Sequence, residues 1–490
     1  MAQHALLAFD LGAESGRTIL GTLDGRQLNI RELSRFPNGM AALLGHLHWD
    51  VLQLFQEMKK GLRMCAAEVT AEPESIGVDT WGVDFALLAP DGSLVGLPYG
   101  YRDPRTNGAM EEFFRRVPRE RVYELTGIQF IQFNSLFQLF AMVRERCPLL
   151  PVASDMLFMP DLFNYLLTGA RRNEFTVATT SQLYNPVTGD WEEELFAALG
   201  ISRDIMQEIV PPGTVLGKLE GEICRETGLK EVPVIATASH DTAAAVAAAP
   251  AEGEGWAYIS SGTWSLMGVE TPKPIITDQS REHNFTNEGG VENTFRVLRN
   301  IMGLWLLRQC REAWAADRRY RYQELSEMAL SAPPFKAVIE PDHPSFLNPP
   351  DMPEAIRNLC RKTKQPAPES PAEFVRCILE SLALKYRLVL DQLREIHARP
   401  IETIHIIGGG ARNNVLCQFT ADATGVEVVA GPAEATAVGN LLVQALGLGC
   451  VGSLAEIRDI VRQSFSVVRY QPTKTPEWQS AYDRFRGLQS

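Results

Sequence analysis

The chain has no excess of positive charge and no long apolar run. Its 490 residues carry 47 Lys and Arg against 60 Asp and Glu, which gives a formal net charge of -13. Non-specific nucleic-acid binding needs clustered basic side chains, so this balance argues against a nucleic-acid partner. No apolar run reaches the ~20 residues that span a bilayer, and the first ten residues lack the features of a secretion signal. We therefore expect a cytoplasmic protein with no membrane partner.

The cysteine spacing of metal sites and disulfide frameworks is also missing. Eight cysteines are spread along the chain with no C-x-x-C pair. This pattern disfavours both a zinc site and a disulfide scaffold. The sequence leaves open whether Cys360 and Cys377 pair, and it leaves the oligomeric state open as well.

The common nucleotide-binding motifs do not occur. There is no Walker pattern G-x-x-x-x-G-K-[ST], and the H-R-D and D-F-G motifs of protein kinases are absent. A formal G-x-G-x-x-G match at Gly447, Gly449 and Gly452 follows a helical run, whereas a dinucleotide-binding fold needs a strand there. Any phosphate site must therefore use another kind of loop.

The length and the alternation of strands with helices predict an α/β protein of more than one domain. A single core stops growing at roughly 250–300 residues, and this chain has 490. Three short strands open the chain, and a helix follows from Asp50. The small, flexible stretch at about 246–254 is the simplest boundary, which predicts domains 1–248 and 249–490. A helix over about 476–488 closes the chain.

The first hairpin, LLAFDLGAESGRTIL, combines two apolar strands with a tight turn and two charged residues. A turn rich in Gly and Ser points backbone N–H groups outward and makes an anion site. Ser15, Gly16 and Arg17 fit a polyphosphate. Asp10, at the end of the first strand, could hold a hydrated Mg²⁺. Taken alone, the stretch is equally consistent with an ordinary hairpin that has a solvated Asp and Arg.

A second hairpin repeats this arrangement directly after Pro250. The stretch WAYISSGTWSLMGVE is again a strand, a turn of small and hydroxyl residues, and a strand. This recurrence predicts an internal duplication. Two such hairpins would bind a nucleotide from both sides, which favours the phosphate-binding interpretation of the first.

Eight segments of the chain resemble the FGGY carbohydrate kinases in order and spacing. They are DLGAESGR, IGVDTWGVDF, YRDPRTNG, MPDLFNYLLTG, ASHDTAAAV, YISSGTWSLMG, NIMGLWLL and IIGGGARNNVLCQFTADATG. The resemblance spans nearly the whole chain. It implies two actin-like (ribonuclease H-like) domains, with ATP and a sugar in an interdomain cleft. It also implies transfer of the ATP γ-phosphoryl group to the 1-hydroxyl of L-rhamnulose, with Mg²⁺.

The same resemblance assigns roles to individual residues. It places Ala13, Glu14, Ser15, Gly16, Arg17, Thr263, Arg308 and Gly409 at ATP, and Gly82, His240, Asp241, Thr242 and Asn300 around the sugar or the transferring phosphate. Two positions depart from the wording of the family, Glu14 in the phosphate turn and Arg308 on the helix of NIMGLWLL. Because a carboxylate facing ATP would be repelled, we expect the Glu14 side chain to point to solvent.

Asp241 is the expected catalytic base, because an alcohol is a poor nucleophile until its proton has an acceptor. The sequence also fits a second interpretation, in which Asp241 caps the alanine-rich helix that follows it. Of the acidic pair Asp79 and Asp84 we expect Asp84 to line the sugar pocket. The alternatives to an L-rhamnulose kinase are a kinase for another ketose or polyol, such as xylulose or fuculose, and an actin-like ATPase without a sugar acceptor.

Overall fold

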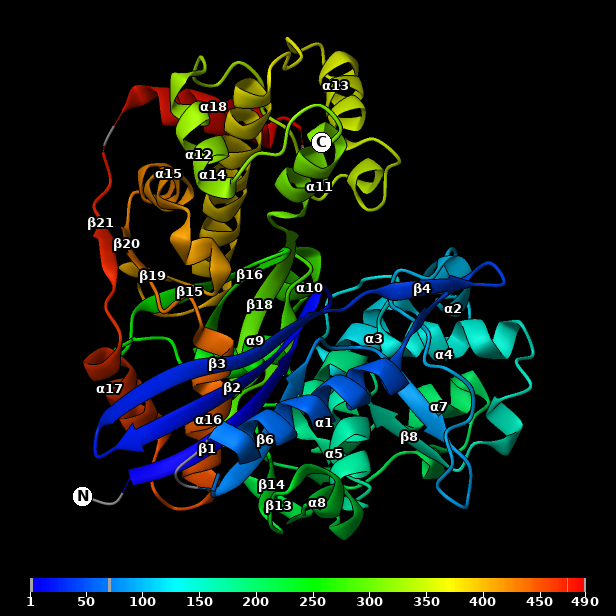
Figure 1. The fold of residues 1–490 in the computed structure, drawn as a ribbon. Coiled ribbons are helices and arrows are strands. Elements are labelled where there is room, and N and C mark those ends of the chain that lie inside the picture. Colours follow the sequence, from blue (N-terminus) through cyan, green and yellow to red (C-terminus); the bar gives the residue numbers. More distant parts are fainter. Residues whose placement is uncertain (1–2, 69–71, 474, 489–490) are drawn as a thin grey trace. The chain divides into compact units, whose positions relative to one another are not determined.

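The computed structural model describes residues 3–68, 72–473 and 475–488 (Figure 1). The chain divides into two compact units, each described here by itself. The first contains residues 1–248, 270–297 and 435–464, and the second contains residues 249–269, 298–434 and 465–490. The first unit is therefore discontinuous in sequence, and its last segment follows most of the second unit along the chain.

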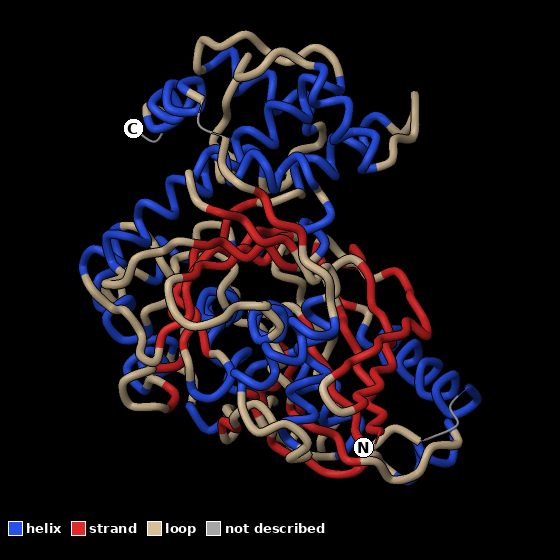
Figure 2. The backbone as a smooth tube through the Cα atoms, turned by 90° about the vertical axis from the view of Figure 1, so that its left-hand side faces the viewer, coloured by secondary structure: helices blue, strands red, loops and turns tan. Residues whose placement is uncertain are grey.

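A six-stranded sheet forms the centre of the first unit. Its strand order is β13–β14–β6–β1–β2–β3. In chain order the strands are β1 (Gln3–Leu11), β2 (Ser15–Asp24), β3 (Gln27–Pro37), β6 (Ser75–Thr80), β13 (Thr214–Lys218) and β14 (Pro233–Ala236). β1 pairs antiparallel with β2 and parallel with β6. Figure 2 shows this strand-rich start beside the N-terminal end.

The β1 sequence reads as a continuous apolar run because both of its faces are covered. Residues 5–11 are all buried. α1 (Val51–Glu68) supplies Leu54, Met58 and Leu62 to the core that contains Leu7 and Phe9. α16 (Ala435–Gly447) also contacts β1 and β6. A strand covered in this way is typical of α/β folds.

The remainder of the first unit is mostly helical and has its own apolar core. Its helices are α2 (Ala109–Phe113), α3 (Arg119–Thr126), α4 (Ser135–Arg144), α5 (Met159–Thr168), α6 (Phe175–Ala178), α7 (Glu193–Leu199), α8 (Gly221–Thr227), α9 (Asp241–Ala247), α10 (Asp278–Glu282) and α17 (Leu454–Ser464). Short strands pair two by two, as β4 (Met40–Leu43) with β5 (His46–Trp49), β7 (Phe85–Leu88) with β8 (Asp155–Phe158), β9 (Asn173–Glu174) with β12 (Ile209–Val210), and β10 (Tyr184–Asn185) with β11 (Asp190–Trp191). Aromatic rings such as Phe113 and Phe137 fill the core.

A seven-stranded sheet of order β17–β18–β16–β15–β19–β20–β21 provides the strands of the second unit. Its members are β15 (Trp256–Ser261), β16 (Trp264–Thr271), β17 (Thr286–Gly289), β18 (Phe295–Met302), β19 (Thr403–Ile407), β20 (Glu427–Ala430) and β21 (Val468–Tyr470). By sequence β17 belongs to the first unit, and the boundary falls within β16 and β18. The helices of the second unit are α11 (Trp305–Trp314), α12 (Tyr322–Ser331), α13 (Met352–Lys362), α14 (Pro371–Ile396), α15 (Asn414–Thr424) and α18 (Pro476–Arg486). α12, α15 and α18 lie beside the long α14 (Figure 1).

The strand pairing of the first hairpin recurs at the second hairpin, as expected for an internal duplication. β15 pairs antiparallel with β16, the next strand, and parallel with β19. This is the pairing of β1 with β2 and β6. In both units a hairpin therefore carries its turn at the same end of a strand that is flanked by a parallel neighbour. Among the described residues, no helix combines the length and the apolar character that crossing a bilayer requires.

Candidate active site

The turn between β1 and β2 is held by backbone hydrogen bonds. The Gly12 N–H donates to the Ser15 carbonyl at 3.0 Å, and the Asn38 N–H donates to the Glu14 carbonyl at 2.9 Å. The Asn38 side chain adds a bond to the Gly12 carbonyl at 2.8 Å. These bonds fix the shape of residues 12–15, which is the property that a preformed anion site needs.

Gly16 is required by close packing beneath this turn. A Cβ atom there would lie 2.2 Å from a ring carbon of Phe36. A larger residue at this position would clash with Phe36, so only glycine lets β2 pack this closely just before Arg17. The Gly/Ser composition that suggested a phosphate turn thus has a packing cause as well.

Asp10 and Arg17 sit opposite one another across the hairpin and form an ion pair. Both side chains are largely buried, at 9% and 15% exposed. The sequence assigned one residue to a metal and the other to phosphate, and the structure brings both to the same place. A buried pair of this kind is costly to leave half-paired.

A second carboxylate, Asp79, lies next to Asp10 on β6. Asp79 is fully buried and accepts a hydrogen bond from Asn440 Nδ2 at 2.6 Å, while its Oδ1 has no partner in the structure. Burial raises its pKa well above the usual value, and the negative charge of Asp10 raises it further. Asn440 belongs to α16. No motif in the sequence indicated that this helix would contribute a side chain to the site.

Asp241 starts α9 near the end of β14. The helix covers Asp241–Ala247, and the residue at the N-cap position is His240. The expectation that Asp241 could cap this helix is therefore wrong, because Asp241 is already its first helical residue. The carbonyl of His240 receives the first helical N–H groups, those of Ala243 and Ala244.

The electrostatic surroundings of Asp241 suit a base. Loss of solvation raises the pKa of its carboxyl, His240 opposes the shift, and the charge of Asp10 adds to it. The side chain keeps 32% of its surface accessible, so a substrate can reach it. Thr242 Oγ1 donates to its Oδ1 at 3.2 Å. A raised pKa and an accessible carboxylate are what proton abstraction from an alcohol requires.

Gly82 and His240 are brought together by pairing of the segments that precede them. Thr80 and His240 form an isolated parallel β-bridge, in which the Thr80 N–H donates to the Ser239 carbonyl at 2.9 Å. A Cβ at Gly82 would lie 3.1 Å from Thr180. The predicted sugar residues Gly82, His240 and Thr242 therefore converge with Asp241 at one end of the first sheet.

Asp84 is fully buried and binds the polar groups of three aromatic residues. Its Oδ2 accepts from Trp49 Nε1 at 2.6 Å and Trp81 Nε1 at 3.0 Å, and also from the Tyr101 N–H at 3.1 Å. Its Oδ1 accepts from Gln138 Nε2 at 2.8 Å. Burial raises its pKa to about 6. With four donors already bound, the expectation that Asp84 lines the sugar pocket is not supported by its geometry.

The second hairpin is tied to the start of α11. The carbonyl of Thr263 accepts from the Gly303 and Trp305 N–H groups, both at 3.2 Å, and the carbonyl of Gly262 accepts from the Leu304 N–H at 3.1 Å. Asn300 lies further back on β18, and its side chain is partly accessible. Arg308 Nε donates to Glu312 at 2.7 Å along α11.

The glycine turn after β19 packs directly on this second hairpin. A Cβ at Gly410 would lie 2.0 Å from Ser261 Oγ, so no larger residue fits there. A Cβ at Gly409 would meet nothing within 4 Å, which leaves its backbone open to a ligand. Gly409 therefore directly precedes the glycine that packs on Ser261, two residues before Thr263; these are two of the three nucleotide positions predicted in the second unit, the third being Arg308.

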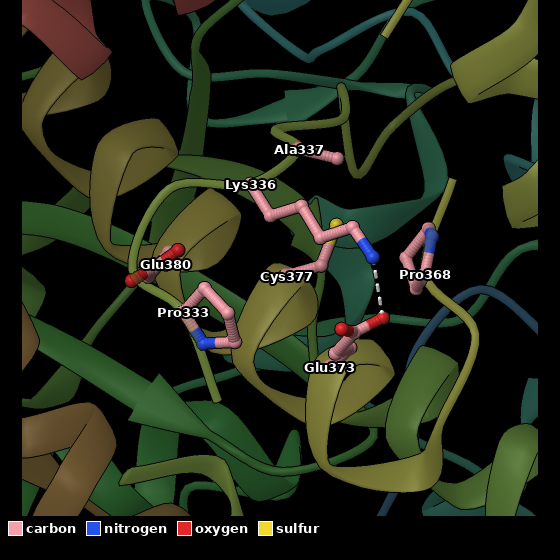
Figure 3. A pocket seen from close by; sticks show the side chains of 7 residues that line it. All are labelled: Pro333, Lys336, Ala337, Pro368, Glu373, Cys377 and Glu380. Carbon is pink, nitrogen blue, oxygen red and sulfur yellow. Dashed lines mark hydrogen bonds and ion pairs between the residues drawn. The ribbon is translucent and has the colours of Figure 1, made fainter. Parts of the chain in front are cut away.

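A separate small cavity of the second unit is not a substrate site. It has a volume of about 10 Å³ and is lined by Pro333, Lys336, Ala337, Pro368, Glu373, Cys377 and Glu380 (Figure 3). Lys336 Nζ donates to Glu373 across it at 2.9 Å. This space suffices for about one water molecule. Cys377 and Cys360 are both free thiols in the structure.

The residues present fit a magnesium–phosphate group. Asp10 contributes to the raised pKa of both Asp79 and Asp241, so three carboxylates act on one another here. Mg²⁺ prefers carboxylate, water and phosphate oxygens, and a cation would relieve this repulsion.

Comparison with known proteins identifies the family. The N-terminal domain model of the FGGY family of carbohydrate kinases matches residues 5–247, and the C-terminal domain model matches residues 257–448. The chain belongs to the FGGY family of carbohydrate kinases. This FGGY kinase therefore takes ATP and a small-molecule sugar as substrates.

Several curated relatives match over nearly the full length. A rhamnulokinase from Bacteroides thetaiotaomicron is 50% identical over 98% of this chain and 98% of its own. A rhamnulokinase from Halalkalibacterium halodurans is 43% identical over 95% and 98%, and one from Bacillus subtilis is 41% identical over 95% of each chain.

Solved structures confirm the predicted α/β fold. A gluconate kinase from Lactobacillus acidophilus superposes with a TM-score of 0.79 at 15% identity, covering 99% of this chain and 97% of its own. A xylulose kinase from Rhodospirillum rubrum gives 0.78 at 20% identity, covering 100% and 98%. At these identities the likeness concerns the fold alone.

Proposed function

We propose that this FGGY kinase transfers the γ-phosphoryl group of ATP to the 1-hydroxyl of L-rhamnulose, as a step of L-rhamnose degradation. The observation that carries the proposal is the set of relatives named rhamnulokinase, at 41–50% identity over almost the entire chain. The carboxylate at the start of α9, together with the neighbouring Gly82 and His240, supplies a fitting acceptor site.

Asp241 is the proposed general base. Its raised pKa and partial accessibility allow it to take the proton of the 1-hydroxyl as the new P–O bond forms. Gly82, His240, Thr242 and Asn300 are proposed to surround the sugar. Because Gly82 has no side chain, its backbone can approach the substrate closely.

The ATP phosphates are proposed to bind at both glycine hairpins. In the first unit Arg17 donates to phosphate oxygens, together with the backbone of Ala13, Glu14, Ser15 and Gly16. In the second unit Thr263, Gly409 and Arg308 contact the nucleotide. Asp10 would hold Mg²⁺, which neutralises charge on the phosphates when bound. Arg17 and Asp10 pair with one another in the structure, so each then gains a second partner of opposite charge.

A panel of acceptors tests this proposal. ADP release is measured with the full chain, MgATP and either L-rhamnulose, L-fuculose, D-xylulose, glycerol or no sugar. We expect the highest kcat/KM with L-rhamnulose, and phosphorus NMR should identify the product as the 1-phosphate. A higher kcat/KM with another ketose would reassign the acceptor, and equal ADP release without sugar would indicate an ATPase.

The acidic net charge supports a small-molecule enzyme without a nucleic-acid partner, and its cytoplasmic location stays a prediction.

A further inference from the structure

A buried ion pair lies behind the imidazole of His240. Arg296 on β18 is fully buried, and its Nη2 lies 3.2 Å from Glu288 Oε2 on β17. The same Nη2 lies 3.2 Å from His240 Nδ1. Arg296 Nε donates to the Gly289 carbonyl at 2.8 Å, which fixes the guanidinium in the plane that reaches the imidazole.

Chemistry restricts how this contact can be made. A guanidinium carries only donors, so His240 Nδ1 has to be the acceptor at 3.2 Å. The ring proton must then sit on Nε2. Nε2 lies 3.4 Å from Asp241 Oδ1, so on that side the ring lies next to the carboxylate of the proposed catalytic base.

The charged groups around His240 come from four elements. They are Asp241 on α9, Glu288 on β17, Arg296 on β18 and Glu174 on β9, whose carboxylate accepts from Thr176 Oγ1 and the Ser239 N–H. Thr176 Oγ1 in turn accepts the His240 N–H at 3.1 Å. The competing arrangement has the proton on Nδ1, directed at Glu288 Oε2, which lies 3.4 Å away.

We propose that Arg296, balanced by Glu288, is a positioning residue that selects the Nε2–H tautomer of His240 and so directs a hydrogen bond to Asp241 Oδ1. This inference rests on the proposed role of Asp241. With Oδ1 engaged by His240 and Thr242, Oδ2 is left to accept the proton of the sugar hydroxyl. Glu288 compensates the charge of Arg296, because a lone buried guanidinium would be strongly unfavourable.

Nitrogen NMR of the full-length protein labelled at histidine tests the tautomer without any assay of turnover. The chain has eight histidines, and the signal lost in His240→Asn identifies His240. We expect the shift pattern of a neutral ring protonated at Nε2. A ring protonated at Nδ1, or doubly protonated at neutral pH, would overturn the proposal whatever the substrate proves to be.

Kinetics test the consequence for catalysis. Arg296→Met should lower kcat roughly tenfold, less than the ~10²-fold minimum for losing a general base, with KM for the sugar nearly unchanged. Arg296→Lys, which keeps a donor, should recover part of the loss. The double change Arg296→Met with Glu288→Met avoids an unpaired carboxylate if the single variant does not fold.

Arg458→Met is the matched control, since Arg458 forms a comparable ion pair with Glu270 at 2.8 Å. It should lower stability without changing the His240 signal or the pH dependence of kcat. An Arg296 variant with wild-type kcat and an unchanged His240 signal would show that the pair is only structural. Absence of kinase activity with every acceptor would instead count against the proposed function, while the NMR result on the tautomer would stand.

An independent cluster of metal-binding side chains lies elsewhere in the first unit. His4, Glu74 and Cys450 each offer one ligand atom, and all three atoms lie within 4.8 Å of one another. His4 Nδ1 is 2.9 Å from Glu74 Oε2 and 3.6 Å from Cys450 Sγ. The three residues belong to β1, the residue before β6, and the end of the turn after α16.

The donor types and one of the two separations suit zinc, whereas His4 Nδ1 and Glu74 Oε2, at 2.9 Å, would have to move apart by about 0.5 Å to bind one ion. Bond lengths of about 2.05 Å to nitrogen and about 2.3 Å to sulfur place the two atoms about 3.6 Å apart in a tetrahedral site. This matches the separation of His4 Nδ1 and Cys450 Sγ. A nitrogen, a thiolate and one carboxylate favour Zn²⁺ over Mg²⁺. We propose that His4, Glu74 and Cys450 bind a zinc-class divalent cation, with water as the fourth ligand.

Cobalt substitution distinguishes this site from a plain ion pair beside a thiol. Titrating the full chain with Co²⁺ should give a thiolate-to-cobalt charge-transfer band that saturates at one equivalent and is displaced by Zn²⁺. Cys450→Ser and His4→Gln should abolish the band. Cys224→Ser is the control, because Cys224 is also a partly accessible free thiol of the first unit. No band in the wild-type chain, or an equal band in Cys450→Ser, would overturn the site.

Discussion

Asp10 and Asp79 occupy paired positions on the parallel strands β1 and β6, with Arg17 opposite Asp10 on β2. Three charged side chains thus meet at the end of one strand, and the Asp79 carboxyl, whose pKa is strongly raised by burial, is held by Asn440. Asp10 therefore stands at the end of an otherwise apolar strand because that end of the strand lies beside Arg17 and Asp79.

Asp241→Asn should reduce turnover by about 10²–10⁴-fold, because the amide cannot accept the proton of the sugar hydroxyl. Melting temperature and nucleotide affinity should change little, since the residue does not cap α9. Steady-state kinetics and isothermal titration with a non-hydrolysable nucleotide measure both. Asp278→Asn provides the control, because Asp278 is also the first residue of its helix, α10. Near-normal turnover in folded Asp241→Asn would exclude it as the base.

Arg17→Ala should weaken MgATP binding and leave sugar binding nearly intact. A hydrogen bond between charged groups contributes about 1.5–3 kcal/mol, which corresponds to roughly 10- to 150-fold in Kd. Arg35→Ala is the matched control. Arg35 faces Arg17 on β3 but pairs with the exposed Glu32. Equal nucleotide affinity of Arg17→Ala and the wild-type protein would remove Arg17 from the phosphate site.

Asp84→Asn should alter how stability depends on pH. The folded-state pKa of Asp84 is about 6 against an ordinary 3.8, so its contribution is fully present below about pH 4 and is lost as the pH rises through 6. Measured across this pH range, the melting temperature of the wild-type protein should fall as the pH rises through 6. The variant should lack this part of the fall.

Above about pH 6, where the wild-type group is a carboxylate, the amide should cost about 1–3 kcal/mol, because one of the four donors loses its acceptor. Asp91→Asn should shift the pH dependence in the opposite sense, because hydrogen bonds from Ser93 lower the pKa of Asp91. Identical pH profiles for Asp84→Asn and the wild-type protein would contradict the assignment.

Two neighbouring glycines should respond differently to alanine. Gly410→Ala forces a methyl group against Ser261 and should destabilise the protein by about 1–3 kcal/mol. Gly409→Ala meets open space, so its melting temperature should stay near that of the wild-type protein while its ATP affinity falls. Thermal unfolding and nucleotide titration separate the two effects. Full ATP affinity in Gly409→Ala would place the nucleotide elsewhere.

Sequence patterns predicted the two hairpins well, since alternation of apolar runs with Gly/Ser turns is a local signal. Asp10 and Arg17 meet because a hairpin of this length sets them opposite one another. The sequence also led to Asp241 through its motif. It misplaced the helix start by one residue, because helix boundaries depend on backbone angles that small residues do not fix.

The partners of these residues were not predictable in the same way. Asn440, Glu288 and Arg296 reach the site from segments far away in the chain, and each is a polar residue in an otherwise ordinary helix or strand. The partners of Asp84 were not predictable for a similar reason, since the indole groups that bind it come from Trp49 and Trp81 on two separate segments. A charged residue predicted to be buried signals that a partner exists but does not identify it.

The discontinuity of the first unit has a consequence for how the protein is made. Residues 435–464, which include the α16 that covers β1 and β6, leave the ribosome only after the whole of the intervening segment 298–434. Until then the nascent chain lacks Asn440 and Gln444, the hydrogen-bond donor to Asp79 and acceptor from Ser75. The first unit to be translated is thus among the last to be completed: the last strand of its six-stranded sheet ends at Ala236, and this sheet stays without the cover of α16, and open to aggregation, while residues 237–434 are made.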